Sequence, residues 1–289
     1  MKVRKAVIPA AGYGTRMLPA AKAIPKEMLP VFDKPAIQYI VEECVNAGIT
    51  DIMIILSRGK DAVEDHFDRS NDLERKLEAD GKTKMLEDMR RLTSMANITY
   101  VRQAEQRGLG DALLCARRFT GDEPFAVLYG DDVIIGEDPA VAQLCRAYEK
   151  YGQSVVGIRE VSPQEVMKYC SMKLKKIDEN YFSISDIIEK PTPKQIFSNY
   201  SILGRCVLRP EIFEVLTHTP YGKNNELQLT DAMKTLAQIK GMIGVEFTGR
   251  RYDMGNKFSA LTASIEEGLR SSEISDQLRE YIKNLAETL

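Results

Sequence analysis

The chain has 289 residues, 44% of them hydrophobic, and a formal net charge of −2. This length suffices for one large globular domain or two small ones, and the near-neutral charge argues against nucleic acid or a membrane surface as a partner. No stretch approaches the length of a membrane span. Five scattered cysteines and two histidines make a disulfide framework, histidine catalysis and a histidine-rich metal site poor candidates.

The N-terminal residues 1–4 enter an apolar run directly and carry no signal-peptide pattern, so we expect a cytoplasmic protein. Short apolar runs then alternate with helical patterns. Strand–helix alternation of this kind predicts an α/β fold with a mainly parallel sheet, helices on both faces, and ligands at the carboxyl ends of the strands. The expected strands are 6–9, 52–56, 98–101, 125–128 and 155–158, and the expected helices are 36–47, 62–67, 109–119 and 140–151.

The loop after the first strand is rich in small residues. Gly12 and Gly14 give it torsional freedom, and its backbone N–H groups can approach an anion closely. Arg16 can fork onto phosphate oxygens, and Lys26 adds a mobile charge. These features predict a nucleoside triphosphate site. A dinucleotide fingerprint would need a third glycine, where the chain has Met17.

Two segments lie outside this alternation. Residues 70–97 are highly charged, with leucines at helical spacing around Gly81, and predict a helical hairpin lying over the sheet. The alternative is a solvated insertion without a role. A final helix is expected from near 258 toward 289, with an apolar face that packs on its own domain or on another subunit.

The Gly-x-Gly-Thr-Arg loop, followed closely by Pro-Lys-Glu-Met-Leu-Pro, resembles the signature of sugar-1-phosphate nucleotidylyltransferases, and most closely that of the bacterial uridylyltransferases. Further motifs follow in family order from residue 5 to about 269. The resemblance implies a single domain over 1–289 with a Rossmann-like three-layer nucleotidyltransferase fold and a mainly parallel mixed sheet. It also implies magnesium-dependent transfer of uridylyl from UTP to glucose 1-phosphate, giving UDP-glucose and pyrophosphate, in a homodimer or homotetramer.

The same resemblance assigns roles to residues of the first loop. Arg16 and Lys26 are implied to be catalytic, because transfer between phosphates depends on positioning and charge neutralisation. The remaining implied nucleotide-binding residues of this region are Ala10, Ala11, Gly12, Gly14 and Glu27.

An acidic turn follows the apolar strand 125–128. The resemblance assigns Asp131 to the magnesium, with Asp132 beside it, although an Asp-rich turn is also a common structural feature. Asp253 lies in Tyr-Asp-Met-Gly, which resembles the family's Tyr-Asp-Cys-Gly, and is the second implied metal ligand. Asn256 stands where the family usually has another Asp.

Base recognition is implied for Gln103 and the backbone of Gly108, because a side-chain amide can accept from and donate to a uracil edge. The family pattern continues with His, where this chain has Asp111. A carboxylate there either disfavours phosphate or forms a helix N-cap.

The sugar phosphate is implied to bind Glu189 and Lys190, from Ile-Glu-Lys-Pro, together with Glu226. A helix should start just after Glu226, with Thr230 or Asp231 as its cap. The chain departs from the family at this pocket. Cys170 replaces a glycine that lies against the sugar, and Asn224 and Asn225 replace the usual Gly-Gly.

Three alternatives remain open. The first is the same chemistry on another sugar 1-phosphate or with dTTP. The second is a weakly active regulatory paralogue, which Cys170, Asp111 and Asn256 would explain. The third is a nicotinamide-dependent oxidoreductase, which the missing third glycine argues against.

Overall fold

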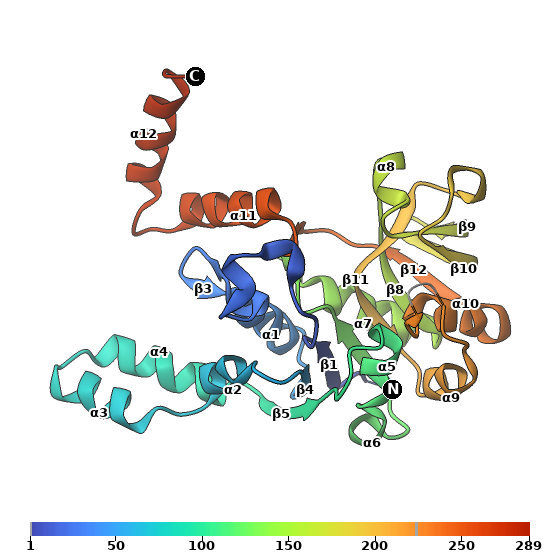
Figure 1. Cartoon of the computed structure of the whole chain (residues 1–289), viewed down its shortest axis with the longest axis horizontal. Helices are drawn as coiled ribbons and strands as arrows, with labels where there is room; N and C mark the ends of the chain where they lie inside the picture. Colours follow the sequence, from blue (N-terminus) through green and yellow to red (C-terminus); the bar gives the residue numbers. More distant parts are fainter. Residues whose placement is uncertain (1, 223–224) are drawn as a thin grey trace.

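A mixed β-sheet forms the centre of the computed structural model, which describes residues 2–222 and 225–289 (Figure 1). Among these residues the sheet has nine strands in the order β5-β4-β1-β6-β11-β8-β12-β10-β9. β10 and β11 run antiparallel to their neighbours and the others share one direction, which confirms the mainly parallel mixed sheet. The strands are β1 Lys5–Pro9, β4 Asp51–Leu56, β5 Asn97–Arg102, β6 Phe125–Leu128, β8 Ser154–Glu160, β9 Cys170–Asp178, β10 Tyr181–Glu189, β11 Tyr200–Leu208 and β12 Met242–Glu246.

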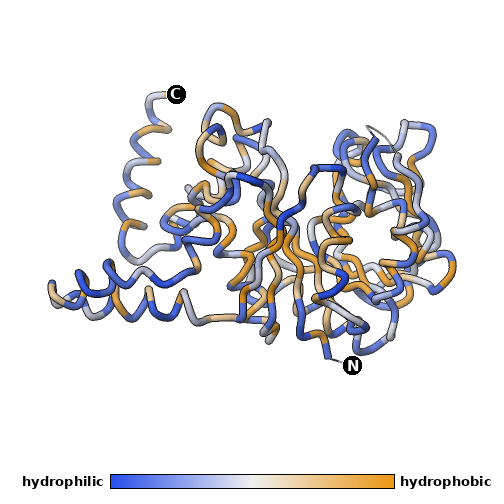
Figure 2. Tube along the Cα trace, turned by 60° about the horizontal axis from the view of Figure 1, so that its bottom comes forward, coloured by the Kyte–Doolittle hydropathy of each residue, from blue (hydrophilic) through white to orange (hydrophobic). Residues whose placement is uncertain are grey.

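Helices cover both faces of this sheet, so the molecule has three layers. β1 shows why, because Ala6 and Ile8 belong to one buried apolar cluster and Val7 to the other. The first cluster includes side chains of α1 and α7, and the second those of α5, α9 and α10. Figure 2 shows the apolar residues concentrated along the central strands. The helices of the two faces are α1 Ala36–Asn46, α7 Ala140–Tyr151, α5 Leu109–Leu114, α9 Glu211–His218 and α10 Leu229–Lys240.

Smaller elements complete the fold. Two-stranded ribbons pair β7 Asp132–Ile135 with β13 Arg250–Asp253 and β2 Pro30–Val31 with β3 Lys34–Pro35. Short 3-10 turns occur at Thr15–Met17, Ala20–Lys22, Lys26–Met28 and Pro193–Gln195. The remaining short helices are α2 Asp61–Phe67, α6 Arg117–Thr120 and α8 Pro163–Val166. None of the helices within the described residues has both the length and the apolar character of a membrane span.

The predicted helix 109–119 is wrong in its extent, because it divides into α5 and α6. Cys115 and Ala116 each donate their N–H to the carbonyl three residues earlier, which tightens the last turn and ends α5. The end of α1 follows expectation. Gly48 has a left-handed backbone (φ 79°) and donates to Val45 O, while Ile49 N donates to Cys44 O, the two bonds of a Schellman cap.

The charged segment forms a helical hairpin of α3 Asn71–Ala79 and α4 Thr83–Ser94, but it does not lie over the sheet as expected. Figure 1 shows it projecting beyond the edge at β5. Its own contacts explain this placement. Leu77 and Leu86 are buried within the hairpin region, and Glu74 accepts hydrogen bonds from both Arg69 and Arg90.

The expected single C-terminal helix is two helices, α11 Lys257–Arg270 and α12 Ser275–Ala286. Ser271 interrupts the helix with an extended backbone (φ −70°, ψ 128°). The end of α11 contacts the start of α12 so closely that a Cβ on Gly268 would lie 2.8 Å from Leu278 Cδ2. Beyond this contact α12 projects from the body of the molecule and buries none of its residues (Figure 1).

Candidate active site

The loop that follows β1 lies at the carboxyl edge of the sheet, as predicted. Of its two glycines only Gly14 has a left-handed backbone (φ 67°), so the torsional freedom expected at Gly12 is not used. A Cβ on Gly14 would also lie 3.2 Å from Lys26 Cβ. Ala10 and Ala11 are buried, and Ala11, Gly12 and Gly14 line a cavity of about 460 Å³. We refer to this as the base-side cavity because it also contains Gln103 and Gly108.

Glu27 does not line that cavity. Its side chain is 1% exposed and its Oε2 accepts from Lys60 Nζ at 2.7 Å. The same ammonium group donates to the carbonyl of Ala10. Burial raises the pKa of Glu27 and lowers that of Lys60. The predicted nucleotide contact of Glu27 therefore has no support in this structure. The Glu27–Lys60 pair instead holds the backbone of the loop at Ala10.

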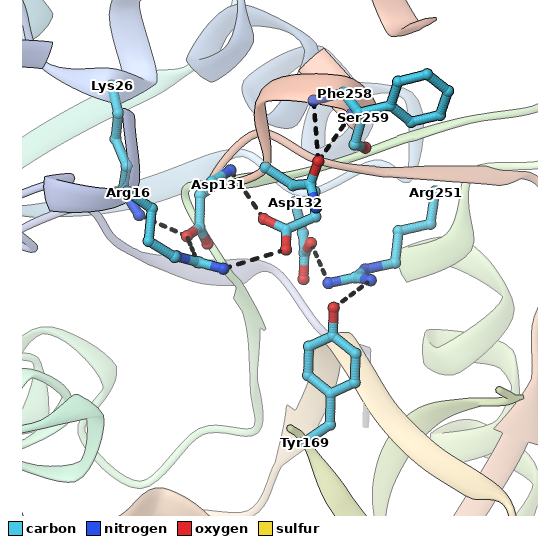
Figure 3. Close-up of polar contacts among 11 residues, drawn as sticks. Arg16, Lys26, Asp131, Asp132, Tyr169, Arg251, Phe258 and Ser259 are labelled. Carbon is cyan, nitrogen blue, oxygen red and sulfur yellow. Dashed lines mark hydrogen bonds and ion pairs between the residues drawn. The ribbon is translucent and has the colours of Figure 1, made fainter. Parts of the chain in front are cut away.

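Two cations and two carboxylates from distant parts of the chain meet beside the loop (Figure 3). Lys26 Nζ lies 2.5 Å from Asp131 Oδ2. Arg16 reaches Asp131 Oδ2 at 3.7 Å through Nη2 and Asp253 Oδ2 at 3.4 Å through Nη1. The structure thus brings together the four residues that the sequence assigned to phosphates and metal.

The charges in this group control each other's protonation. Burial lowers the pKa of Lys26, but Asp131 and Glu27 more than offset it, so the pKa lies above its ordinary value. Burial raises the pKa of Asp131, but Lys26 and Arg16 outweigh it, so the pKa lies below its ordinary value. At neutral pH both groups are charged.

Two close backbone approaches fix the turn that carries Asp131. A Cβ on Gly130 would lie 2.8 Å from Pro9 O, at the end of β1. A Cβ on Gly204 of β11 would collide with the side chain of Asp132. On the far side, Met254 N donates to Asp131 O at 2.8 Å, which ties the turn to the segment after β13. The acidic turn is therefore wedged between β1, β11 and β13.

Asp132 is buried beside the group and lines a small cavity of about 180 Å³ together with Arg16, Asp131 and Asp253. It is 3% exposed and pairs with Arg251 Nη2 at 2.6 Å. Burial raises the pKa of Asp132 to about 6, against the opposing effect of Arg251. Arg251 also donates to Tyr169 OH at 3.4 Å, so it links the acidic turn to the neighbouring cavity (Figure 3). The sequence reasoning missed Arg251, although it shares a strand face with Asp253 two residues later.

A fully buried ion pair supports the same region. Arg205 of β11 is 0% exposed and donates to Glu43 of α1 at 2.7 Å and to Asp132 O at 2.8 Å. Glu43 also accepts from the backbone N–H of Val141 at the start of α7. This pair joins the helices of one face to the strand that carries Gly204, and no sequence motif pointed to it.

The sugar-side cavity, as we call it, has a volume of about 490 Å³ and adjoins this group. Its walls include Arg16, Cys170, Glu189, Lys190 and Thr230. Thr230 Oγ1 donates to Glu189 Oε2 at 2.9 Å, and burial raises the pKa of Glu189. Thr230 is thus a partner of Glu189 inside α10, whose N-cap is Gln228, so the expected capping by Thr230 or Asp231 is wrong.

Cys170 is 2% exposed, and its Sγ accepts from the Ile202 N–H at 3.3 Å. Burial raises the pKa of the thiol to about 12. The side chain is therefore a packed, neutral part of the cavity wall. Glu226 lines the base-side cavity and accepts from Gln228 Nε2 at 2.9 Å, so it does not share the wall with Glu189. Asn225 has a left-handed backbone (φ 57°), and Asn224 lies outside the described residues.

The amide of Gln103 lies in the base-side cavity as expected. Its Nε2 donates to Asp111 Oδ2 at 2.7 Å and to Gly108 O at 3.3 Å. Asp111 is the third residue of α5 rather than its N-cap, which is Gly108. The N-cap role weighed for Asp111 is therefore wrong, and its carboxylate instead accepts from the amide of Gln103.

Asn256 caps α11. Its Oδ1 accepts from Phe258 N at 2.9 Å and from Ser259 N at 3.1 Å (Figure 3). The replacement of an expected Asp by Asn thus keeps the N-cap role.

The described residues hold no cluster of three or more His, Cys, Asp or Glu side chains that would enclose a metal ion. Asp131 and Asp253 nevertheless present carboxylate oxygens toward the same Arg16 guanidinium. One or two carboxylates, completed by substrate phosphates, are a usual Mg²⁺ site, so this pair fits a metal that binds together with a nucleotide.

Known proteins resemble this chain in both sequence and fold. The model of the nucleotidyl transferase family matches residues 5–267. A UTP–glucose-1-phosphate uridylyltransferase (YngB) of Bacillus subtilis strain 168 is 49% identical over 98% of this chain and 96% of its own, and a second such enzyme, from Staphylococcus saprophyticus, is 48% identical over 98% of both. Among solved structures, the UTP-bound UGPase of Acinetobacter baumannii has a TM-score of 0.91 and 33% identity, covering 98% of this chain and 99% of its own. A UDP-glucose pyrophosphorylase complexed with UDP-glucose has a TM-score of 0.84 and 41% identity, covering 93% and 100%.

Proposed function

The chain belongs to the nucleotidyl transferase family, and we propose that it transfers the uridylyl group of UTP to glucose 1-phosphate, giving UDP-glucose and pyrophosphate. One observation carries the proposal. Arg16, Lys26, Asp131 and Asp253 meet where the base-side and sugar-side cavities adjoin, since Lys26 lines the first and Arg16 the second. A nucleotide and a sugar phosphate seated in the two cavities would join there.

The reaction needs little covalent help from the protein. A phosphate oxygen of glucose 1-phosphate attacks the α-phosphorus of UTP, and the bond from that phosphorus to the bridging oxygen breaks as pyrophosphate leaves. Lys26 and Arg16 neutralise the repulsion between the two anions and the charge that grows on the leaving group. Asp131 and Asp253 would hold Mg²⁺, which when bound neutralises phosphate charge and fixes the phosphates' orientation.

The residues that line the two cavities have the remaining roles in substrate binding. Gln103 and the Gly108 backbone read the base, while Ala10, Ala11, Gly12 and Gly14 leave room for the phosphates. Glu189 accepts from sugar hydroxyls and Lys190 meets the sugar phosphate. Glu226 is a further acceptor for a substrate hydroxyl.

We place this activity in the cytoplasm, in a single-domain protein that forms a homodimer or homotetramer. Exposed apolar side chains on the two C-terminal helices, among them Phe258 and Leu261 of α11 and Tyr281 and Leu285 of α12, support self-association. Size-exclusion chromatography with light scattering tests this part, and a monomer at micromolar concentration would contradict it.

Pyrophosphate release tests the activity, with UTP, dTTP, CTP, ATP and GTP each crossed with glucose 1-phosphate and other sugar 1-phosphates, with and without Mg²⁺. We expect rapid release with UTP and glucose 1-phosphate only when Mg²⁺ is present. Rapid pyrophosphate release with another sugar 1-phosphate instead would indicate a different sugar specificity, set by the cavity wall around Cys170. Binding of UTP without release from any pair would favour the regulatory paralogue.

A further inference from the structure

The orientation of the Gln103 side chain is fixed by its neighbours. Gln103 follows β5, and its backbone N–H donates to Leu56 O at 2.9 Å. Its side chain is 4% exposed and lines the base-side cavity. A primary amide carries two N–H donors and one carbonyl acceptor. Asp111 Oδ2 and Gly108 O take the Nε2 donors at 2.7 and 3.3 Å.

This arrangement has one chemically sensible orientation. Asp111 as a carboxylate and Gly108 O as a carbonyl can only accept, so a reversed amide would place Gln103 Oε1 against two other acceptors. Asp111 is itself held in place, because Arg107 Nη2 lies 3.3 Å from its Oδ1 and its side chain is 13% exposed. Among the described residues no group donates to Gln103 Oε1. The carbonyl oxygen is therefore the part of this amide that remains for a ligand.

We propose that Asp111 is a positioning residue for base selection, which makes Gln103 act as an acceptor alone. This inference rests on the proposed function, which places a pyrimidine nucleotide in this cavity. Uracil and thymine carry a hydrogen on N3 and can donate to Gln103 Oε1. Cytosine has a lone pair on N3 and meets the same oxygen with repulsion. The Asp111–Gln103 pair thus favours UTP over CTP and does not distinguish UTP from dTTP.

The test compares Asp111→Ala, Asp111→Asn, Gln103→Ala and the double variant. Kd values for UTP, CTP and dTTP are measured by calorimetry, and kcat and KM by pyrophosphate release. Without Asp111 only the longer bond to Gly108 O, at 3.3 Å, opposes a turn of the amide. We therefore expect the UTP-over-CTP preference of Asp111→Ala to fall about tenfold, mainly through KM for UTP. The UTP-over-dTTP preference should not change. Asp111→Asn still offers an acceptor oxygen and should retain the preference within about threefold.

The double variant separates positioning from general damage. If Asp111 acts through Gln103, adding Asp111→Ala to Gln103→Ala should cause no further loss of preference. An unchanged UTP-over-CTP preference in Asp111→Ala would overturn the inference, as would an equal drop in the Gln103→Ala background or a loss in Asp111→Asn as large as in Asp111→Ala. Failure of the wild-type chain to turn over UTP would instead overturn the proposed function, and the UTP and CTP affinities would still test the inference.

Discussion

Lys26 Nζ lies 2.5 Å from Asp131 Oδ2, so the cation proposed for the phosphates and the carboxylate proposed for the metal neutralise each other in this structure. Neither charge is then left unpaired at a site where 13% of one side chain and 24% of the other is exposed. In the proposed reaction two new pairs would replace this one, because phosphate oxygens would bind Lys26 and a metal ion would bind Asp131. The Lys26–Asp131 ion pair thus belongs to the enzyme before substrates bind.

Removal of Lys26 should slow turnover far more than it weakens nucleotide binding. Loss of one preorganised charge that faces the transition state typically slows a reaction about 100- to 1000-fold, and we expect that range for Lys26→Ala. Pyrophosphate release gives kcat, and calorimetry gives Kd for UTP. Lys84→Ala, on the exposed face of α4, is the matched control and should leave kcat unchanged. A kcat for Lys26→Ala within a few-fold of the wild type would remove Lys26 from the catalytic role.

Glu189 should give the sugar site an acidic pH limit. Burial raises its pKa above the ordinary value of 4.5, and the ionised form is the one that accepts from sugar hydroxyls. As the pH falls through that raised pKa, kcat/KM for glucose 1-phosphate should fall in the wild type and not in Glu189→Gln. The ratio of the two enzymes at each pH cancels the titration of the substrate phosphates. A ratio that stays flat down to pH 4.5 would contradict this role.

The Arg205–Glu43 pair should matter for stability, not for chemistry. Arg205→Ala leaves the Glu43 carboxylate buried without its partner, and we expect a loss of about 3–5 kcal/mol in the free energy of unfolding, measured with urea. Arg209→Ala breaks a pair with Glu211 in which both side chains are about one-third exposed, and should lose less than about 1 kcal/mol. Equal losses in the two variants would show that the buried pair is not a significant support of the turn beside it.

Asn256 should act as a helix cap. Asn256→Ala removes the acceptor for the N–H groups of Phe258 and Ser259, and should lower the free energy of unfolding by about 1 kcal/mol. Asn256→Asp keeps the acceptor and should be as stable as the wild type within a few tenths of a kcal/mol. Thermal unfolding at pH 7 checks both. Identical stability of the alanine variant would mean that water replaces the cap without loss.

Cys170→Gly should not improve the enzyme. The thiol fills a buried place beside Ile202, so its removal leaves a small void and adds backbone freedom to the unfolded chain, a loss of about 2 kcal/mol. We expect lower stability and no gain in turnover with glucose 1-phosphate, with Cys170→Ala as the milder control. A faster Cys170→Gly enzyme would show that the side chain obstructs the sugar.

The sequence alone predicts the strands β1, β4, β5, β6 and β8, and it misses β9, β10, β11 and β12. In β1, β4 and β6 continuous apolar runs mark strands that are buried on both faces. The β9–β10 hairpin carries exposed lysines at 173, 175 and 176, which conceal its strand character. The position of β11 and β12 between strands distant in sequence follows from tertiary packing, and no local pattern encodes it.

The candidate site shows the same division. Motifs locate Arg16, Lys26 and Asp131, because loops at strand ends carry chemistry in this type of fold. The residues that hold them are found only in three dimensions. Glu27 and Lys60 are 33 residues apart, and Arg205 and Glu43 are 162 apart. Asp111 is an example, because its hydrogen bond with Gln103 depends on where α5 begins relative to the end of β5.

The two glycines that wedge the acidic turn also constrain how this protein can evolve. Any side chain at 130 would collide with the backbone at Pro9, and any side chain at 204 would collide with Asp132. We therefore expect no substitution of either glycine to be tolerated. In a saturation library selected for activity, we expect these two codons to remain fixed while surrounding positions drift. Changes in substrate specificity would then have to arise from substitutions in the walls of the two cavities, while the acidic turn stays the same.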